Sequence, residues 1–582
     1  MTKETGNTVL LELNRRIQDH LAKLYADADL DVISAEIFKI MGFAGDVAEV
    51  DQHSNLWDEK DIVVITYGDS IKTEHELPLV TLQRFLQEYL QEVVSIVHIL
   101  PFYPFSSDDG FSVINYSEVN QSLGDWQHIS AIAKDFSLMA DLVINHCSSR
   151  SLWFDNFKQR QSPGIDYFIE CDTDIDLDGV VRPRTSPLLR PTETLDGERH
   201  VWCTFSHDQV DLNFKNPAVL LEFIRIIKLY MDHGVSLFRL DAVAFLWKEL
   251  GTPCINLIET HEVIRLLRLL IEHYHSDAIV ITETNIPNRE NLSYFGNANE
   301  AHWIYNFTFP PLVLYTLLSG KSDCLKQWMM SMPPAQNGTA YFNFIASHDG
   351  IGLRPVEDIL SEQEVDELAA LMKEFGGDVS WRAMTDGQHR PYELNISLID
   401  ALKGTFAGED GYQMDRFVCA HAIMLALEGV PAFYVHSLLA TGNDLQKMEM
   451  TSNKRSINRH VWDYDDLVDQ LNDTQCQHHQ AFVRLTQLIT VRKCQKAFHP
   501  NATQFTMHFE ESLFAFWRQS QDRSQSIFCI YNISNEPNEL ALKDVNLTEL
   551  DEWRDLISGQ QYPDLRETVL LQPYEFVWLT NI

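Results

Sequence analysis

The sequence lacks the features of several large classes of protein. Lys and Arg number 45 against 84 Asp and Glu, and the resulting formal net charge of −39 argues against broad binding of nucleic acids or anionic membranes. The most apolar long stretch, residues 417–435, is interrupted by His421, Glu428 and Pro431, so no transmembrane run is present. The opening residues contain no apolar segment of a signal peptide. We therefore expect no nucleic-acid partner and no membrane association.

Cysteine is scarce and shows no pattern. The nine cysteines are scattered, odd in number and include no Cys-x-x-Cys pair. This distribution favours free thiols in a reducing compartment over a disulfide framework, so we expect a cytoplasmic protein. No nucleotide-binding motif and no ligand spacing of a transition metal is present either. We therefore expect no cofactor and no bound metal.

The chain is long enough for several structural units, and its pattern changes along its length. Residues 1–58 are predicted to form a helical extension, residues 59–495 alternate apolar strands with amphipathic helices, and residues 496–582 are predicted to form antiparallel strands. Apolar residues at helical spacing support the extension: Leu10, Leu11, Leu13, Ile17 and Leu21. The eight strands of the central part are expected at residues 62–67, 93–100, 139–145, 235–241, 279–283, 303–309, 341–347 and 432–436.

Eight apolar strands that alternate with helices predict a (β/α)8 TIM barrel rather than an open sheet. Two connections are too long for simple loops, since residues 147–210 follow the third strand and residues 350–402 follow the seventh. Both leave from strand C-terminal ends, where the active sites of barrels are built. The predicted fold class is therefore α/β: a TIM barrel with inserted domains after strands 3 and 7, a helical N-terminal extension and a C-terminal antiparallel β domain.

Arg239 and Asp241, at the end of the fourth strand, are the first candidates for chemistry. They are two residues apart, so both side chains lie on one face of the strand. Arg239 would keep Asp241 ionised and oriented, which suits a carboxylate nucleophile. Taken alone, the pair is explained equally well as a buried structural salt bridge.

Three other strand ends bring carboxylates and histidines to the same rim. Polar residues at four strand ends of one barrel favour an active site over separately buried polar groups. The residues at the third, fifth and seventh strands are Asp141, Asn145, His146, Glu283, Ser347, His348 and Asp349.

These four segments resemble, in order and composition, the four sequence regions of the α-amylase superfamily, glycoside hydrolase family 13. The resemblance implies a retaining mechanism in which Asp241 attacks the anomeric carbon, Glu283 protonates the leaving oxygen and Asp349 stabilises the transition state. Retention needs a nucleophile and an acid about 5 to 5.5 Å apart. We expect the pKa of Glu283 to be raised and that of Asp241 to be lowered by their neighbours.

From Asp61 onward the chain is also similar to the sucrose phosphorylase subfamily, through segments such as ILPFYPFSSDDGFS (99–112), SHDGIG (347–352) and KRSINRH (454–460). In such enzymes phosphate replaces water and opens the glucosyl–enzyme intermediate to α-glucose 1-phosphate. The resemblance implies a glucose subsite made of Asp108, Phe111, His146, Phe205, Gln209, Arg239, His348 and Arg459. Its matching positions for phosphate or the acceptor are Arg184, Tyr392 and Glu393.

The acceptor is predicted from differences between this sequence and those of sucrose phosphorylases. Glu393 stands where sucrose phosphorylases have Gln, and ASHDGIGLRP (346–355) and PYELN (391–395) resemble the glucosylglycerate phosphorylase branch. We predict phosphorolysis of 2-O-α-glucosylglycerate to α-glucose 1-phosphate and glycerate. Sucrose, glucosylglycerol and sucrose 6-phosphate are the alternative substrates, and an α-glucoside hydrolase or transglucosidase is the alternative of another class.

A glycerate carboxylate needs a cation, and the second insertion offers four candidates: Arg354, Arg382, His389 and Arg390. The expected partners are thus small molecules only, an α-glucoside and inorganic phosphate, with phosphate acting as a substrate rather than as a cofactor. The resemblance is compatible with a monomer or a homodimer.

Overall fold

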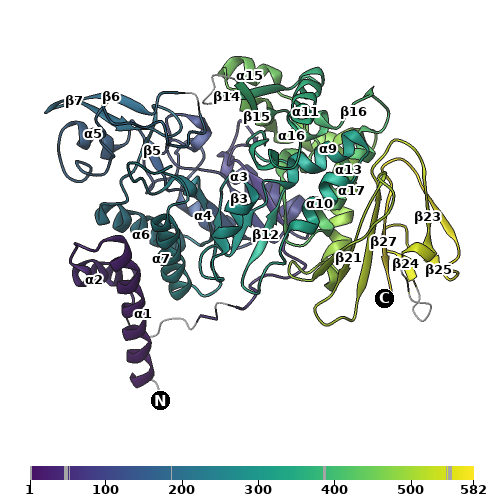
Figure 1. Ribbon diagram of the computed structural model, residues 1–582, viewed down its shortest axis with the longest axis horizontal. Helices are drawn as coiled ribbons and strands as arrows, with labels where there is room; N and C mark the ends of the chain where they lie inside the picture. Colours follow the sequence, from purple (N-terminus) through teal and green to yellow (C-terminus); the bar gives the residue numbers. More distant parts are fainter. Residues whose placement is uncertain are drawn as a thin grey trace.

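The computed structural model describes residues 3–44, 50–51, 53–184, 186–383, 389–545, 547 and 553–582. Its centre is a closed barrel of parallel strands, which confirms the predicted fold class (Figure 1). Neighbours around the barrel follow the order β1-β18-β12-β11-β10-β9-β4-β3. The strands are β1 (Val63–Thr66), β3 (Ile96–Ile99), β4 (Ser137–Val143), β9 (Val235–Asp241), β10 (Ile279–Thr282), β11 (Trp303–Tyr305), β12 (Ala340–Asn343) and β18 (Val430–Tyr434).

Helices cover the outside of the barrel, and local sequence sets where they begin. In α6, the Asn216 side chain accepts a hydrogen bond from the Ala218 N–H and Pro217 occupies the first turn, so the helix starts in a defined place. The larger helices are α3 (Pro78–Phe85), α4 (Trp126–Ile132), α6 (Pro217–Asp232), α7 (Ile258–Tyr274), α9 (Phe309–Ser319), α10 (Asp323–Ser331), α13 (Gln413–Ala426), α16 (Tyr464–Asn472) and α17 (Gln477–Lys493). None of the helices within the described ranges has the length and apolar character needed to cross a membrane.

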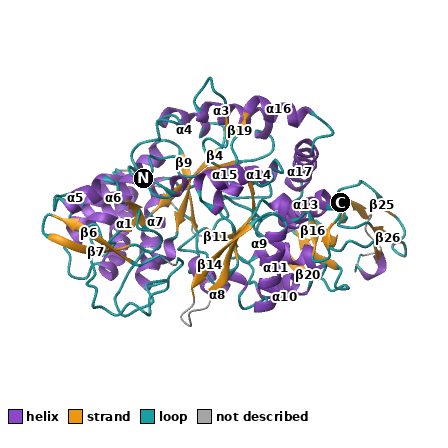
Figure 2. Cartoon of the chain, turned by 90° about the horizontal axis from the view of Figure 1, so that it is seen from above, coloured by secondary structure: helices purple, strands orange, loops and turns teal. Residues whose placement is uncertain are grey.

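The connection after β4 forms the first inserted domain. Its strands β5 (His146–Ser148) and β8 (Gln209–Asp211) pair antiparallel and close its base, one residue beyond each end of the predicted range. Farther out lie α5 (Leu152–Lys158) and a hairpin of β6 (Leu189–Thr194) and β7 (Gly197–Trp202). The hairpin and the C-terminal strands lie at opposite ends of the molecule (Figure 2).

The connection after β12 forms the second insertion, as predicted from its length. It holds a three-stranded sheet of order β13-β15-β14 and the helix α11 (Glu362–Glu374). The strands are β13 (Ile351–Gly352), β14 (Asp378–Ala383) and β15 (His389–Asn395), and α12 (Leu398–Ala401) follows them. Because β13 leaves directly from the seventh barrel strand, this sheet lies against the rim of the barrel.

The N-terminal extension is a pair of helices, α1 (Lys3–Leu24) and α2 (Leu30–Met41), which contact α7 and α6 respectively. Leu13, Ile17 and Leu21 are buried as their spacing predicts, whereas Leu11 is 66% exposed. Lys23 and His20 both contact Glu262 of α7, at 2.7 Å each. Apolar packing and charge therefore attach the extension to the barrel.

After the barrel, antiparallel strands form a sheet of order β20-β21-β22-β27-β24-β25 and a separate pair, β23-β26. These strands are β20 (Thr503–Thr506), β21 (Leu513–Gln519), β22 (Ser526–Asn532), β23 (Asn538–Ala541), β24 (Trp553–Asp555), β25 (Gln561–Tyr562), β26 (Thr568–Leu571) and β27 (Phe576–Thr580). The predicted boundaries 1–58, 59–495 and 496–582 stay predictions, although the helix pair, the barrel strands and this sheet fall inside them.

Candidate active site

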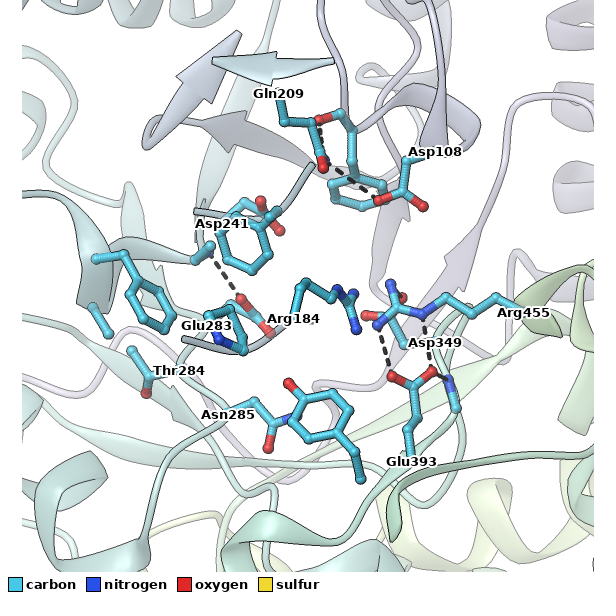
Figure 3. A pocket seen from close by; sticks show the side chains of 18 of the residues that line it. Asp108, Arg184, Gln209, Asp241, Glu283, Thr284, Asn285, Asp349, Glu393 and Arg455 are labelled. Atoms are coloured by element: carbon cyan, nitrogen blue, oxygen red, sulfur yellow. Dashed lines mark hydrogen bonds and ion pairs between the residues drawn. The ribbon is translucent and has the colours of Figure 1, made fainter. Parts of the chain in front are cut away.

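A pocket of about 800 Å³, counting its open mouth, lies at the C-terminal ends of the barrel strands. Figure 3 shows acidic and basic side chains converging on it from several elements. Most of the predicted site residues line it: Asp108, Phe111, His146, Arg184, Phe205, Gln209, Asp241, Glu283, His348, Asp349, Tyr392 and Glu393. Arg239 and Arg459 are the two predicted residues that lie behind its wall.

Arg239 holds the end of β9 in place. Its guanidinium donates one hydrogen bond to Asp241 Oδ1 at 2.8 Å and another to Asp141, which lies opposite it on β4. Asp141 is in turn bound by His98 Nε2 at 2.7 Å. The Arg239–Asp241 pair is thus a buried ion pair, as the simpler interpretation required. It engages only one oxygen of Asp241, however, and no described residue binds Oδ2.

Glu283 follows β10 and lies beside Asp241. Its Oε2 accepts a hydrogen bond from the Ala242 N–H at 2.9 Å, and Arg239 Nη2 is 3.8 Å from its Oε1. Ala242 has a φ of +50°, in the left-handed region, and this turn after Asp241 directs the amide toward Glu283. The backbone amide of Ala242 is a site feature that sequence reasoning missed.

Burial raises the pKa of Glu283, as expected for a proton donor. Burial also raises the pKa of Asp241, where the sequence led us to expect a lowered value, because Glu283 and Asp141 add negative charge that Arg239 only partly offsets. Arg239 donates to Asp241 at 2.8 Å but is 3.8 Å from Glu283. Arg239 therefore favours the ionised form of Asp241 more strongly than that of Glu283.

Asp349 is surrounded by cations. Its Oδ1 lies 2.6 Å from Arg455 Nη1 and 3.5 Å from Arg459 Nη2. Burial alone would raise the pKa of Asp349, but these guanidinium groups lower it. His348 beside it is neutral, because burial and the nearby Arg239 and Arg459 hold its pKa well below the usual range. Asp349 thus lines the pocket as a carboxylate.

Another part of the pocket lining combines aromatic rings with polar groups. The rings of Phe111 and His348 stack 4.9 Å apart with 3° between their planes. Gln209 Nε2 donates to the Phe111 carbonyl at 3.1 Å, lies 3.4 Å from Asp108 and 3.2 Å from His146 Nε2. This combination of ring faces and hydrogen-bonding groups suits a sugar ring.

Asp208 anchors the loop that carries Asp108 and Phe111. Its side chain accepts hydrogen bonds from Ser106 and Ser107 at 2.5 Å and from Ser149 at 2.6 Å. These contacts show that Asp208 joins this loop to the first insertion.

Arg459 was predicted beside Asp108 in the glucose subsite. It lies 3.9 Å from Asp108 and pairs more closely with Asp109 at 2.5 Å, while its Nε donates to the His348 carbonyl at 2.8 Å. It therefore supports the pocket wall from behind. The roles assigned to these residues by resemblance stay predictions.

Arg455 is the functional side chain that sequence reasoning missed. Besides Asp349, it donates from Nε and Nη2 to both oxygens of Glu393, at 2.9 and 2.8 Å (Figure 3). Glu393 is buried, and although burial opposes ionisation, Arg455 lowers its pKa. The signal was present in KRSINRH, where Arg455 is the second residue.

The cationic candidates of the acceptor side separate into paired and unpaired groups. Arg382 binds Glu357 and Arg390 binds Glu362, each at 2.5 Å, and His389 is exposed, so none of these three lines the pocket. Arg184 and Arg354 do line it. Arg184 lies 5.7 Å from the centre of the Tyr392 ring.

Comparison with known proteins agrees with this geometry. Residues 86–369 match the family model "Alpha amylase, catalytic domain" and residues 504–578 match "Maltogenic Amylase, C-terminal domain". The chain is 41% identical over 532 residues to a glucosylglycerate phosphorylase of Spirochaeta thermophila, covering 90% of each chain. A glucosylglycerate phosphorylase of Allomeiothermus silvanus is 40% identical and covers 98% of this chain and 99% of its own.

The chain belongs to the α-amylase superfamily and to its glucosylglycerate phosphorylase family. The resemblance stated from the four strand-end segments is thereby confirmed. A sucrose phosphorylase of Streptococcus mutans is more distant, at 28% identity over 70% of this chain and 83% of its own. The crystal structure of a sucrose 6F-phosphate phosphorylase from Thermoanaerobacter thermosaccharolyticum has the same fold, with a TM-score of 0.72, 24% identity, and coverage of 88% of this chain and 98% of its own.

Proposed function

We propose that this member of the family is a glucosylglycerate phosphorylase, which transfers glucose from 2-O-α-glucosylglycerate to inorganic phosphate and releases glycerate. The observation that carries the proposal is the about 40% identity to glucosylglycerate phosphorylases over most of the chain. The pocket supports it with one carboxylate held for attack, one proton donor and unpaired cations beside them.

The proposed reaction is a double displacement. The unbound Oδ2 of Asp241 attacks the anomeric carbon of the glucosyl group, and the bond to the glycerate oxygen breaks as Glu283 protonates that oxygen. A phosphate oxygen then attacks the same carbon and displaces Asp241, while Glu283 takes up the phosphate proton. The two inversions give α-glucose 1-phosphate with overall retention.

Phosphate must be attracted by a protein with a net charge of −39. Local cations make this feasible, since the field inside a cleft depends on its own lining. Arg184, beside Tyr392, is the proposed phosphate contact. Arg455 binds both oxygens of Glu393, which weakens the repulsion between that carboxylate and phosphate.

The test is transfer in the reverse direction. Purified protein is incubated with α-glucose 1-phosphate and glycerate, fructose, glycerol or fructose 6-phosphate, and release of phosphate is measured for each acceptor. We expect glycerate to have the highest kcat/KM. A large preference for fructose would identify a sucrose phosphorylase instead, and hydrolysis independent of any acceptor would identify a glucosidase.

We further propose that the reaction needs no cofactor or metal, so that dialysis against a chelator leaves kcat unchanged. Free thiols at all nine cysteines are consistent with the proposed cytoplasmic location. Oligomeric state, monomer or homodimer, is measured by sedimentation of the purified chain.

A further inference from the structure

The segment Gly350–Arg354 carries a pattern that the catalytic mechanism does not use. Gly350 and Arg354 flank the short strand β13 and line the pocket, whereas Gly352 within the strand does not. Strand β13 pairs antiparallel with β15, with Gly352 opposite Glu393 and Ile351 opposite Leu394. The segment therefore runs along the acceptor side of the pocket in a fixed register.

The two glycines let neighbouring side chains contact this backbone. A Cβ on Gly350 would lie 2.5 Å from the Leu394 carbonyl oxygen and 2.6 Å from Glu393 Cγ. A Cβ on Gly352 would lie 2.8 Å from Asn285 Nδ2. Glu393 and Asn285 are thus held closely against the strand, two positions apart.

Asn285 presents an unpaired acceptor beside the catalytic acid. It follows Glu283 by two residues and lines the same pocket (Figure 3). Its Oδ1 is buried and has no hydrogen-bond partner within the described chain. Buried polar atoms are usually satisfied, so this oxygen is expected to meet a donor when the site is filled.

Arg354 begins the short helix η5 (Arg354–Val356) directly after this strand. It is partly buried, and no described residue accepts a hydrogen bond or forms an ion pair with its guanidinium. The contrast with its neighbours is clear: Arg382 and Arg390 of the same insertion are bound to Glu357 and Glu362. In a chain with 84 acidic and 45 basic residues, a partly buried guanidinium left without a carboxylate indicates that a ligand supplies one.

We infer that Arg354 binds the carboxylate of the acceptor and selects small hydroxy acids over neutral polyols and sugars, with Asn285 Oδ1 accepting a hydrogen bond from an acceptor hydroxyl. A planar guanidinium matches a carboxylate with two parallel hydrogen bonds, which fixes orientation as well as charge. Arg184, which lies 5.7 Å from the centre of the Tyr392 ring, remains for phosphate. The inference rests on the proposed function, because it explains how that site recognises glycerate.

The test compares two acceptors that differ only in the carboxylate. Wild type and Arg354→Ala are assayed with α-glucose 1-phosphate and either glycerate or glycerol. Loss of a charge-assisted pair predicts that kcat/KM for glycerate falls about tenfold to a hundredfold, while kcat/KM for glycerol stays within about twofold. Arg390→Ala removes the same charge from an ion pair outside the pocket, and we expect it to change neither value.

Each of the other possible results would overturn the inference and would point to a different role for Arg354. If Arg354→Ala keeps the preference for glycerate over glycerol, Arg354 does not select the acceptor. If it instead raises the KM for phosphate in the phosphorolytic direction and leaves the acceptor preference unchanged, Arg354 binds phosphate. If both acceptors lose activity equally, its role is structural. Failure of the wild type to use glycerate at all would refute the proposed function first and the inference with it.

Discussion

Replacing Arg455 by Ala is expected to reduce both activity and stability, because this side chain binds the buried carboxylate of Glu393 and the partly buried carboxylate of Asp349. It contacts Asp349 Oδ1 at 2.6 Å and both oxygens of Glu393 at 2.9 and 2.8 Å. Its side chain is 18% exposed and that of Glu393 only 2%. The replacement removes the positive charge that offsets the negative charges of Asp349 and Glu393 in the pocket.

The size of the effect follows from burial. Removing one partner of a buried ion pair costs about 3–5 kcal/mol, and the lower end applies here because Asp349 is 23% exposed and keeps Arg459 at 3.5 Å. We therefore expect a loss of about 3 kcal/mol in the free energy of unfolding. The kcat/KM should fall at least about a hundredfold, because Asp349 loses the contact that orients it.

The lowered pKa values of these carboxyls also determine whether their contribution to stability rises or falls with pH. Arg455 lowers the pKa of both Asp349 and Glu393, so these carboxyls contribute stability above their unfolded pKa values and lose it as pH falls through the folded ones. The difference between wild type and variant should thus be largest at neutral pH and shrink in acid.

The assay is denaturant unfolding at several pH values together with phosphorolysis kinetics. Arg390→Ala is the control, because that ion pair is 37% and 76% exposed and should contribute less than about 1 kcal/mol. Equal losses in the two variants, or a normal kcat/KM for Arg455→Ala, would refute the reasoning.

Three further predictions concern other parts of the molecule. Glu283→Gln should abolish turnover of glucosylglycerate but retain glucosyl transfer from α-glucosyl fluoride to the enzyme, because fluoride leaves without protonation; equal loss with both donors would contradict the acid role. Gly350→Ala should lower kcat/KM without unfolding the barrel, because its Cβ would lie 2.7 Å from Glu393 Oε1, and kinetics alongside circular dichroism test this. Glu262→Gln should lower the melting temperature by weakening the contacts to His20 and Lys23, and an unchanged value would show that apolar packing alone holds the extension.

The positions of many barrel strands were predictable, because parallel strands that are buried on both faces have continuous apolar sequences. The fourth strand was predicted at residues 235–241, where β9 lies. The sixth strand was predicted at residues 303–309, but β11 ends at Tyr305 and α9 begins at Phe309. Aromatic residues there satisfy a strand pattern and a buried helix start equally well, so periodicity could not place the boundary.

That Asp241, Glu283 and Asp349 share one pocket was predictable from their positions at strand ends, but their environment was not. Arg455 and Glu393 are 62 residues apart and meet only through tertiary structure. The raised pKa of Asp241 has the same origin, since it reflects burial together with the negative charges of Glu283 and Asp141 from two neighbouring strands. Single-sequence patterns identify candidate groups, and only the fold shows which charges compensate one another.

The most direct test of the account is identification of the residue that carries glucose. Glu283→Gln protein is mixed with α-glucosyl fluoride in the absence of phosphate, digested and examined by mass spectrometry. We expect one glucosyl group to be attached to the peptide containing Asp241, and added phosphate to remove it as α-glucose 1-phosphate. A label on another residue, or none while glucose 1-phosphate still forms, would contradict it.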